Sequence, residues 1–177
     1  MRTSSLTIAT IVLLAGCASS PSATRHDAMV VDANRNVFRS ADYGIRASFN
    51  APRDSVFTAL AQAYADAGIT PDMVDTKENI VSRKQILIPR VFNGKRASLL
   101  FSCGETATGQ SLAENGQLYA SVRSQITGEF DHPTVQTLVD GYVIPNGGTS
   151  SSALHCGSTG EIERWIREKT SVRLGVR

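Results

Sequence analysis

Residues 118–126 read Leu-Tyr-Ala-Ser-Val-Arg-Ser-Gln-Ile, and this stretch decides the fold. Its apolar side chains occupy alternate positions, which predicts a strand with one face in the core and the other in water. The apolar positions are Leu118, Ala120, Val122 and Ile126, and the positions between them carry Tyr119, Ser121, Arg123 and Gln125. A sheet built from such strands needs a cover over its apolar face only.

Several other stretches predict strands that would pair with this one. We expect strands at residues 45–49, 69–74, 80–88, 97–103 and 134–144. Pro71 either weakens the strand at 69–74 or places it on an edge of the sheet, because proline cannot donate to a ladder. Asn93-Gly94 is a strong hairpin signal, and residues 76–79 are typical of a turn.

Two amphipathic helices are available to cover the apolar face. The first should begin at Pro52 and end at Gly68, with apolar residues at helical spacing between them. The second should follow Ser158, whose hydroxyl and the Glu161 carboxylate would form a capping box. The sequence therefore predicts an α+β domain over residues 43–177, with an antiparallel sheet of four to six strands under two helices.

The N-terminus carries a different signal, Leu14-Ala15-Gly16-Cys17 after a short apolar run. This sequence is typical of a bacterial lipobox, where a signal peptide (residues 1–16) is removed and Cys17 receives acyl chains such as palmitate. The apolar run is far below the ~20 residues needed to span a bilayer. An ordinary secretory signal with an incidental cysteine is the alternative.

Residues 17–42 are expected to form a flexible tether, with a short hairpin around residues 34–36. Ala18 after the lipidated cysteine predicts an outer-membrane location facing the periplasm, since Asp there is the usual signal for retention in the inner membrane. Besides the membrane, an envelope protein is a possible partner.

The other two cysteines, Cys103 and Cys156, are expected to form a disulfide. Export would place both thiols in an oxidising compartment, and lipidation would remove the competing Cys17. Two unpaired, buried cysteines are the alternative. A metal site is not expected, because no histidine or carboxylate cluster at ligand spacing accompanies them.

Composition and motifs exclude several classes of function. The chain has 18 basic and 16 acidic residues, a balance that gives no electrostatic basis for binding nucleic acid. Common nucleophile, zinc-hydrolase and dinucleotide-binding motifs do not occur, and the three histidines lie in expected loops or the tether. We therefore expect no enzymatic activity and no cofactor.

One turn resembles a binding site. Gly157, Ser158, Thr159 and Gly160 precede the second helix, and backbone N–H groups with hydroxyls at a helix start favour anions. The alternative is that these residues only cap the helix.

Parts of the chain resemble known lipoproteins. Residues 51–60 (Ala-Pro-Arg-Asp-Ser-Val-Phe-Thr-Ala-Leu), with Gly68-Ile69 and the turn from Asp75 to Ile80, resemble the repeated domain of the C-type lipoprotein subunit of the outer-membrane β-barrel assembly machinery. The second half is similar to a family of bacterial lipoproteins that share Arg-x-Ser before Cys-Gly, and a second cysteine in Cys-Gly-Ser-Thr-Gly. The first resemblance implies a helix-grip-like fold; the second implies a fold and a disulfide, and neither implies a reaction.

These observations together predict a non-enzymatic, lipid-anchored periplasmic domain that serves as an accessory or scaffold in the cell envelope. The alternative is a carrier that holds a small apolar ligand between the sheet and the long helix. A carrier needs a cavity of ~300 Å³ or more, whereas a scaffold is packed solid. The bulky residues available to fill such a cavity are Phe57, Tyr64, Phe101 and Trp165.

Overall fold

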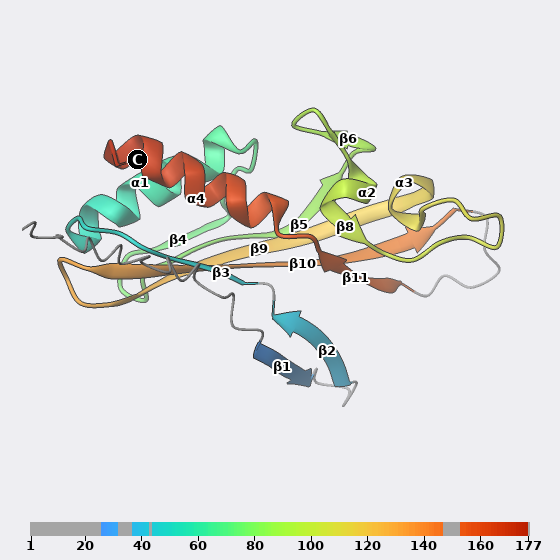
Figure 1. Cartoon of the computed structure of the whole chain (residues 1–177), viewed down its shortest axis with the longest axis horizontal. Helices are drawn as coiled ribbons and strands as arrows, with labels where there is room; N and C mark the ends of the chain where they lie inside the picture. Colours follow the sequence, from blue (N-terminus) through green and yellow to red (C-terminus); the bar gives the residue numbers. More distant parts are fainter. Residues whose placement is uncertain (1–25, 32–36, 43, 147–152, 177) are drawn as a thin grey trace, which may run out of the picture.

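The computed structural model describes residues 26–31, 37–42, 44–146 and 153–176 (Figure 1). The strands are β1 (His26–Val31), β2 (Val37–Asp42), β3 (Ile45–Ser48), β4 (Met73–Asp75), β5 (Ile80–Ile88), β6 (Val91–Phe92), β7 (Lys95–Arg96), β8 (Phe101–Ser102), β9 (Gly116–Gly128), β10 (Pro133–Pro145) and β11 (Leu154–Ser158). The helices are α1 (Arg53–Asp66), α2 (Ala97–Leu100), α3 (Leu112–Asn115) and α4 (Glu161–Leu174). Predicted signal peptide residues 1–16 and Cys17 lie outside the described residues.

The main sheet is built around the β9–β10 pair, two antiparallel strands of 13 residues each. The strand order is β4-β5-β9-β10-β11-β8, and β3 also pairs with β10. Since β9 holds one edge of β10, β3 and β11 share the other edge, β3 along residues 134–137 and β11 along residues 140–143. The α+β class is confirmed, and with seven strands the sheet is one strand larger than the upper limit expected from the sequence.

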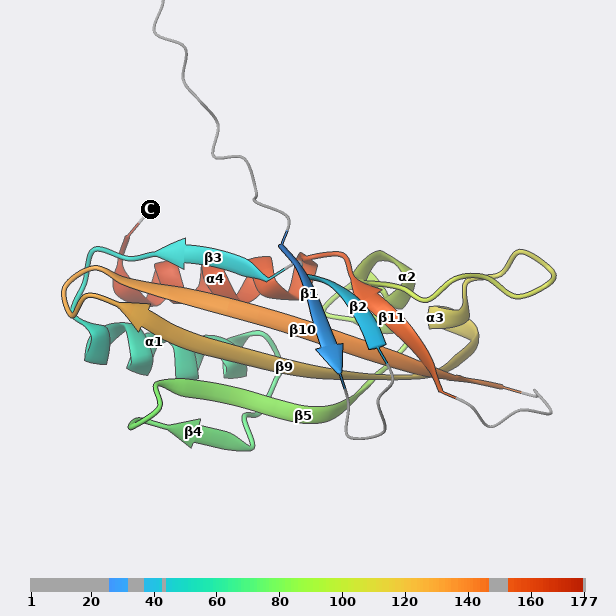
Figure 2. The same ribbon diagram turned by 90° about the horizontal axis from the view of Figure 1, so that it is seen from below.

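Helices α1 and α4 lie side by side on one face of this sheet, as Figures 1 and 2 show from two directions. Their inner faces and the alternate residues of the strands form one apolar core. Val56 and Leu60 of α1 and Ile162 and Ile166 of α4 are fully buried there. Asp66 and Arg173 join the ends of the two helices through two hydrogen bonds of 2.8 Å each.

A buried polar group fixes α1 against the strands. The Tyr64 hydroxyl lies 3.0 Å from the Val81 carbonyl oxygen and 3.0 Å from Ser124 Oγ, which is 2.7 Å from Thr137 Oγ1. Burial raises the pKa of Tyr64, so its hydroxyl stays protonated and can donate in this network. Because these groups have partners only in this arrangement, they specify how α1 sits on β5, β9 and β10.

Several local predictions are confirmed. Strand β5 covers residues 80–88 as expected, and Asn93-Gly94 connects β6 to β7 with both residues at positive φ. The strand expected at 69–74 is an edge strand, but it is shorter than predicted, since β4 covers only Met73–Asp75, after Pro71. Gly68, at φ 70°, ends the first helix as predicted, whereas Pro52 is the residue before the helix rather than its first turn. Strands β1 and β2 form the hairpin expected around residues 34–36.

Other predictions were wrong. Residues 97–103 do not form a strand: Ala97–Leu100 is the short helix α2, and only Phe101 and Ser102 pair, at the edge of the sheet. Trp165, one of the bulky residues available to fill an interior cavity, is only partly buried, and its ring packs against Phe92 of the β6–β7 hairpin with centroids 6.2 Å apart. Residues 154–158, which precede the second helix, form a strand that the sequence pattern did not indicate.

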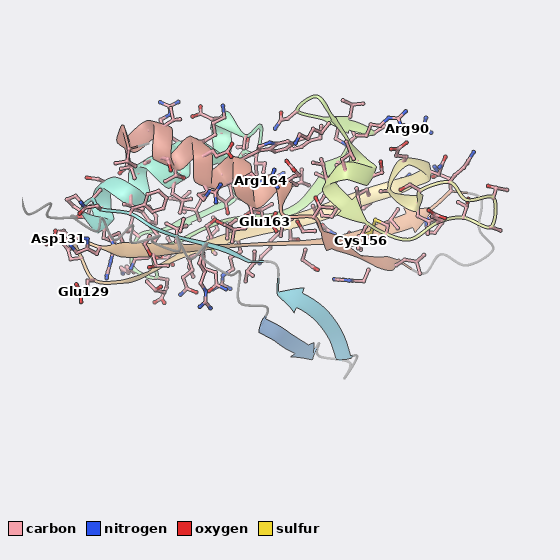
Figure 3. The ribbon with its side chains drawn as sticks, viewed as in Figure 1. Arg90, Glu129, Asp131, Cys156, Glu163 and Arg164 are labelled. Carbon is pink, nitrogen blue, oxygen red and sulfur yellow. A yellow bond between two sulfur atoms is a disulfide. The ribbon has the colours of Figure 1, made fainter. Side chains whose placement is uncertain are left out.

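Cys103 and Cys156 are joined by a disulfide, with an S–S distance of 2.08 Å and a Cα–Cα distance of 4.2 Å. The bridge connects the residue after β8 to the middle of β11. It therefore links the edge strand of the sheet to the strand beside it. Cys156 is fully buried, and Figure 3 shows it on β11 beneath the start of α4. Within the described residues, no helix is long and apolar enough to cross a membrane.

Truncation of Leu60 to alanine is expected to lower the free energy of unfolding by about 2–5 kcal/mol, because Leu60 is fully buried between α1 and the sheet. Urea unfolding measures the change. Val172→Ala is the control, since that side chain is 74% exposed and its loss should have almost no effect. An unchanged midpoint for Leu60→Ala would contradict the packing of α1.

Reduction of the Cys103–Cys156 bridge is expected to destabilise the domain by up to about 4 kcal/mol, because the bridge closes a loop with a sequence separation of 53. Urea unfolding with and without a reductant tests this. The double variant Cys103→Ala/Cys156→Ala should be as unstable as the reduced protein and insensitive to the reductant. If the unreduced protein, once denatured, reacts with a thiol reagent at both cysteines, the bridge does not form in solution.

Candidate functional site

The face of the main sheet opposite the helices is open to solvent over much of its area and carries a distinct set of side chains. Along β9 and β10 the residues on the helix side are mostly buried, whereas those between them are half-buried or exposed. The open face, as we call it, therefore displays Tyr119, Ser121, Arg123, Gln125, Gln136, Leu138, Asp140 and Tyr142. Most of these side chains are polar, but one leucine and two tyrosines lie among them, and Leu87 of β5 adds a second leucine to the same face.

A leucine, two tyrosines and a histidine form a row across four strands. Leu87 of β5 pairs with Tyr119 of β9, which pairs with Tyr142 of β10, which pairs with His155 of β11. The two tyrosine rings are stacked, with centroids 5.2 Å apart and planes inclined by 18°. These four residues are called the tyrosine row below. Leu87 is 59% exposed, so the apolar end of the row reaches the surface of the described structure.

Polar contacts hold the tyrosine row in place. His155 Nε2 lies 2.6 Å from Asp140 Oδ1, and Gln85 Nε2 donates to the Tyr142 hydroxyl at 3.0 Å. Gln85 belongs to β5, so its amide reaches across β9 to a ring on β10. The contacts thus tie three strands together at one place on the open face.

A β-bulge gives Gln85 its unusual direction. The register of β5 against β9 shifts between Arg83 and Ile86, and Gln85 has a φ of 49°. A left-handed backbone is uncommon for a residue other than glycine, and bulges commonly redirect a side chain near a functional site. Here the bulge carries the Gln85 amide to Tyr142 instead of along the strand.

The arrangement of polar groups on the open face is unsuited to nucleophilic catalysis. A hydrolytic triad requires the imidazole between the hydroxyl and the carboxylate. Ser121 is instead the direct cross-strand neighbour of Asp140, so the carboxylate is next to the hydroxyl. Among the described residues, no group of three histidine, cysteine or acidic side chains could hold a metal ion.

The predicted anion site at Gly157, Ser158, Thr159 and Gly160 is divided between a strand and a turn. Gly157 and Ser158 belong to β11, and Gly160 precedes the helix with a left-handed backbone. The Thr159 hydroxyl donates to the carbonyl oxygens of Leu99 and Leu100. These contacts attach the turn to α2, and no hydroxyl of the turn is left to bind an anion.

The predicted capping box does not form. The Ser158 hydroxyl accepts from the N–H of Gly160 rather than that of Glu161, and it donates to Glu163. The Glu161 carboxylate forms ion pairs with Lys95 and Arg164, both at 2.5 Å. These two cations, Lys95 first, lower the pKa of Glu161.

Glu163 is the one acidic side chain of α4 that points toward the sheet, as Figure 3 shows. It is 1% exposed; Ser158 Oγ lies 2.9 Å from its Oε2, and its Oε1 has no hydrogen-bond partner. Burial raises its pKa to about 7.

The tyrosine row was not predicted from the sequence, although a signal for it was present. The pattern of residues 118–126 put Tyr119 on the water side, but it did not say what lies beside it. In an antiparallel pair, the numbers of facing residues have a constant sum, so the turn at residues 129–132 fixes Tyr142 opposite Tyr119. His155 could not be found in this way, because β11 was not predicted.

Replacement of Glu163 by glutamine is expected to change how stability depends on pH. The carboxyl group has a pKa of about 7 when folded and 4.5 when unfolded, so both states are protonated below pH 4.5. Between pH 4.5 and 7 only the unfolded state releases the proton, so stability falls with rising pH and levels off above 7. The total fall attributable to Glu163 is on the order of 3 kcal/mol.

Glu163→Gln should lack this fall and be more stable than the parent above pH 7, with little difference near pH 4. Chemical unfolding at a series of pH values measures the difference between the two proteins. Glu168→Gln, on the exposed side of the same helix, should follow the parent at every pH. Parallel curves for the parent and Glu163→Gln would contradict a buried, protonated Glu163.

Comparison with known proteins adds no relative to this description. No model of a known protein family matches the chain, and no curated protein matches it.

Proposed function

We propose that the protein is a non-enzymatic, lipid-anchored domain of the bacterial outer membrane that faces the periplasm and serves as an accessory or scaffolding component of the cell envelope. The observation that carries this proposal is the sequence Leu14-Ala15-Gly16-Cys17 after a short apolar run. Acyl chains on Cys17 would anchor the domain, and more than one chain is needed for stable retention. The Cys103–Cys156 disulfide is in keeping with an oxidising compartment.

The packing of the core supports a scaffold over a carrier. Three of the four bulky residues that could line a ligand cavity, Phe57, Tyr64 and Phe101, are buried in the apolar core, and Trp165 lies against the β6–β7 hairpin. An open hollow of about 410 Å³ is lined by residues of α1 and α4 alone, so it does not lie between the sheet and α1. A second hollow of about 290 Å³ is lined by Arg90, Gln110, Ser111, Glu114 and Asn115.

The open face supports a role in association rather than catalysis. It joins stacked tyrosines and exposed leucines on a rigid, twisted sheet, which is the composition of a contact surface rather than of a reaction centre. Ser121, Asp140 and His155 are not in the order that nucleophilic catalysis requires.

Replacement of Cys17 by serine tests the anchor. In cells supplied with labelled palmitate, the parent should incorporate label and Cys17→Ser should not, because serine lacks the thiol that is acylated. Cys17→Ser should also accumulate as unprocessed precursor. The matched control is Ser20→Ala, which leaves the Leu14–Cys17 sequence intact and should be processed and labelled normally.

The membrane location has its own test. Ala18→Asp should move the labelled protein from the outer-membrane to the inner-membrane fraction of a sucrose gradient. Label on Cys17→Ser would contradict lipidation, and a labelled parent in the inner-membrane fraction would contradict only the location.

A further inference from the structure

The open face raises the question of what covers it. Helices α1 and α4 occupy the other side of the sheet, and Leu87 and Leu138 on the open side are 59% and 37% exposed in the described structure. Exposed leucines beside stacked tyrosines favour a cover, because burial of apolar area from water is favourable. The path of the chain before β3 indicates which segment provides it.

Strand β3 cannot be extended toward its N-terminus along β10. Ile45 pairs with Thr137, and only Leu138 and Val139 separate this pair from Asp140, where β11 begins its pairing with β10 opposite Gly157. The chain before Ile45 must therefore leave the plane of the sheet. On the helix side this space is occupied by the start of α4. A Cβ on Gly160 would lie 3.8 Å from Ile45 Cδ1.

Gly44, the residue before β3, lies close to side chains of the open face. A Cβ on Gly44 would lie 2.5 Å from Leu138 Cδ2 and 3.2 Å from Gln136 Nε2, and both side chains belong to the open face. Gly44 thus lies against the Leu138 side chain, at a distance that a larger residue would not allow without a shift. Asp42, the last residue of β2, is only two positions before Gly44, so the hairpin must begin within about 7 Å of Gly44.

The hairpin of β1 and β2 is long enough to cover the tyrosine row. The two strands pair in register over six residues each, about 20 Å, and the four strands crossed by the tyrosine row span about 14 Å. An isolated two-stranded hairpin is marginally stable in water and needs a surface to pack on. Figure 1 shows β1 and β2 on the side of the sheet opposite the helices, and Figure 2, seen from that side, shows them in front of β9, β10 and β11.

We infer that the open face is the docking site of the chain's own β1–β2 hairpin, which packs across the tyrosine row beside the close contact of Gly44 with Leu138. The hairpin is then a cover made by the segment that connects the N-terminus to the domain. A partner that binds the tyrosine row must displace it. The inference does not depend on lipidation of Cys17.

Thiol labelling of the full-length chain tests this cover. Ser121→Cys places a thiol in the middle of the open face, and Glu168→Cys places one on the exposed side of α4 as a control. Maleimide labelling at each position is followed by peptide mapping, so that reaction at Cys17 is counted separately. In the parent background the Ser121→Cys thiol should react at least tenfold more slowly than the Glu168→Cys thiol.

The hairpin is then opened by Val30→Asp with Phe38→Asp. These residues are cross-strand partners, and like charges placed opposite each other destabilise a ladder. Labelling of Ser121→Cys should accelerate at least tenfold, whereas labelling of Glu168→Cys and the thermal midpoint of the domain should not change. Fast labelling already in the parent would overturn the inference. Slow labelling in both backgrounds would overturn it too, and sedimentation would then show whether a second copy is the cover.

Hydrogen exchange gives a second measurement from the other side of the contact. Tyr142→Ser removes the centre of the tyrosine row and should speed exchange of the amides of β1 and β2 several-fold, with the amides of β9 and β10 at Ser124 and Thr137 still protected. Val172→Ser, which alters an exposed apolar residue on α4, should leave the hairpin amides as they were. Equal hairpin exchange in Tyr142→Ser and the parent would contradict docking on this face.

Discussion

The antiparallel ladder between β9 and β10 is the constraint on which the rest of the structure depends. It runs from the Gly128–Pro133 pair to the Gly116–Pro145 pair without a register shift. Because side chains alternate between the two faces of a strand, this single register assigns Val122 and Val135 to the core and Tyr119 and Tyr142 to the open side together. A slip of one residue in one strand would move its tyrosine to the helix side and expose its apolar residues.

The outer edge of β10 carries a second constraint, because two segments distant in sequence share it. Strand β3 pairs with residues 134–137 of β10, and β11 pairs with residues 140–143. The Cys103–Cys156 bridge attaches β11 to the residue after β8. Helix α4 begins three residues after β11 and therefore starts above this shared edge. The same sharing forces the chain before β3 out of the sheet, so the placement of the N-terminal segment follows from the pairing of β10.

The two sides of the sheet have different physical characters, and these agree with the proposed role. The helix side is filled by large apolar residues and by the Tyr64, Ser124 and Thr137 hydroxyls, which have partners only in this arrangement. The open side has an ordered row of rings supported by Gln85 and Asp140. A rigid domain that presents such a face suits contact with a neighbouring segment or protein. Glu163, buried at the start of α4 with a pKa of about 7, makes the helix side sensitive to pH.

The sequence by itself determined the α+β class, the first helix and most of the central strands, because periodicity and turn residues are local signals. It also determined the partners of the disulfide, because only two cysteines remain once Cys17 is assigned to lipidation. It did not determine β11, the replacement of a strand by α2, or the position of Trp165, since short segments adopt the conformation that their neighbours in space allow. The tyrosine row was decided only by tertiary structure. Its members come from four strands, and the register of the sheet, together with the bulge at Gln85, brings them together.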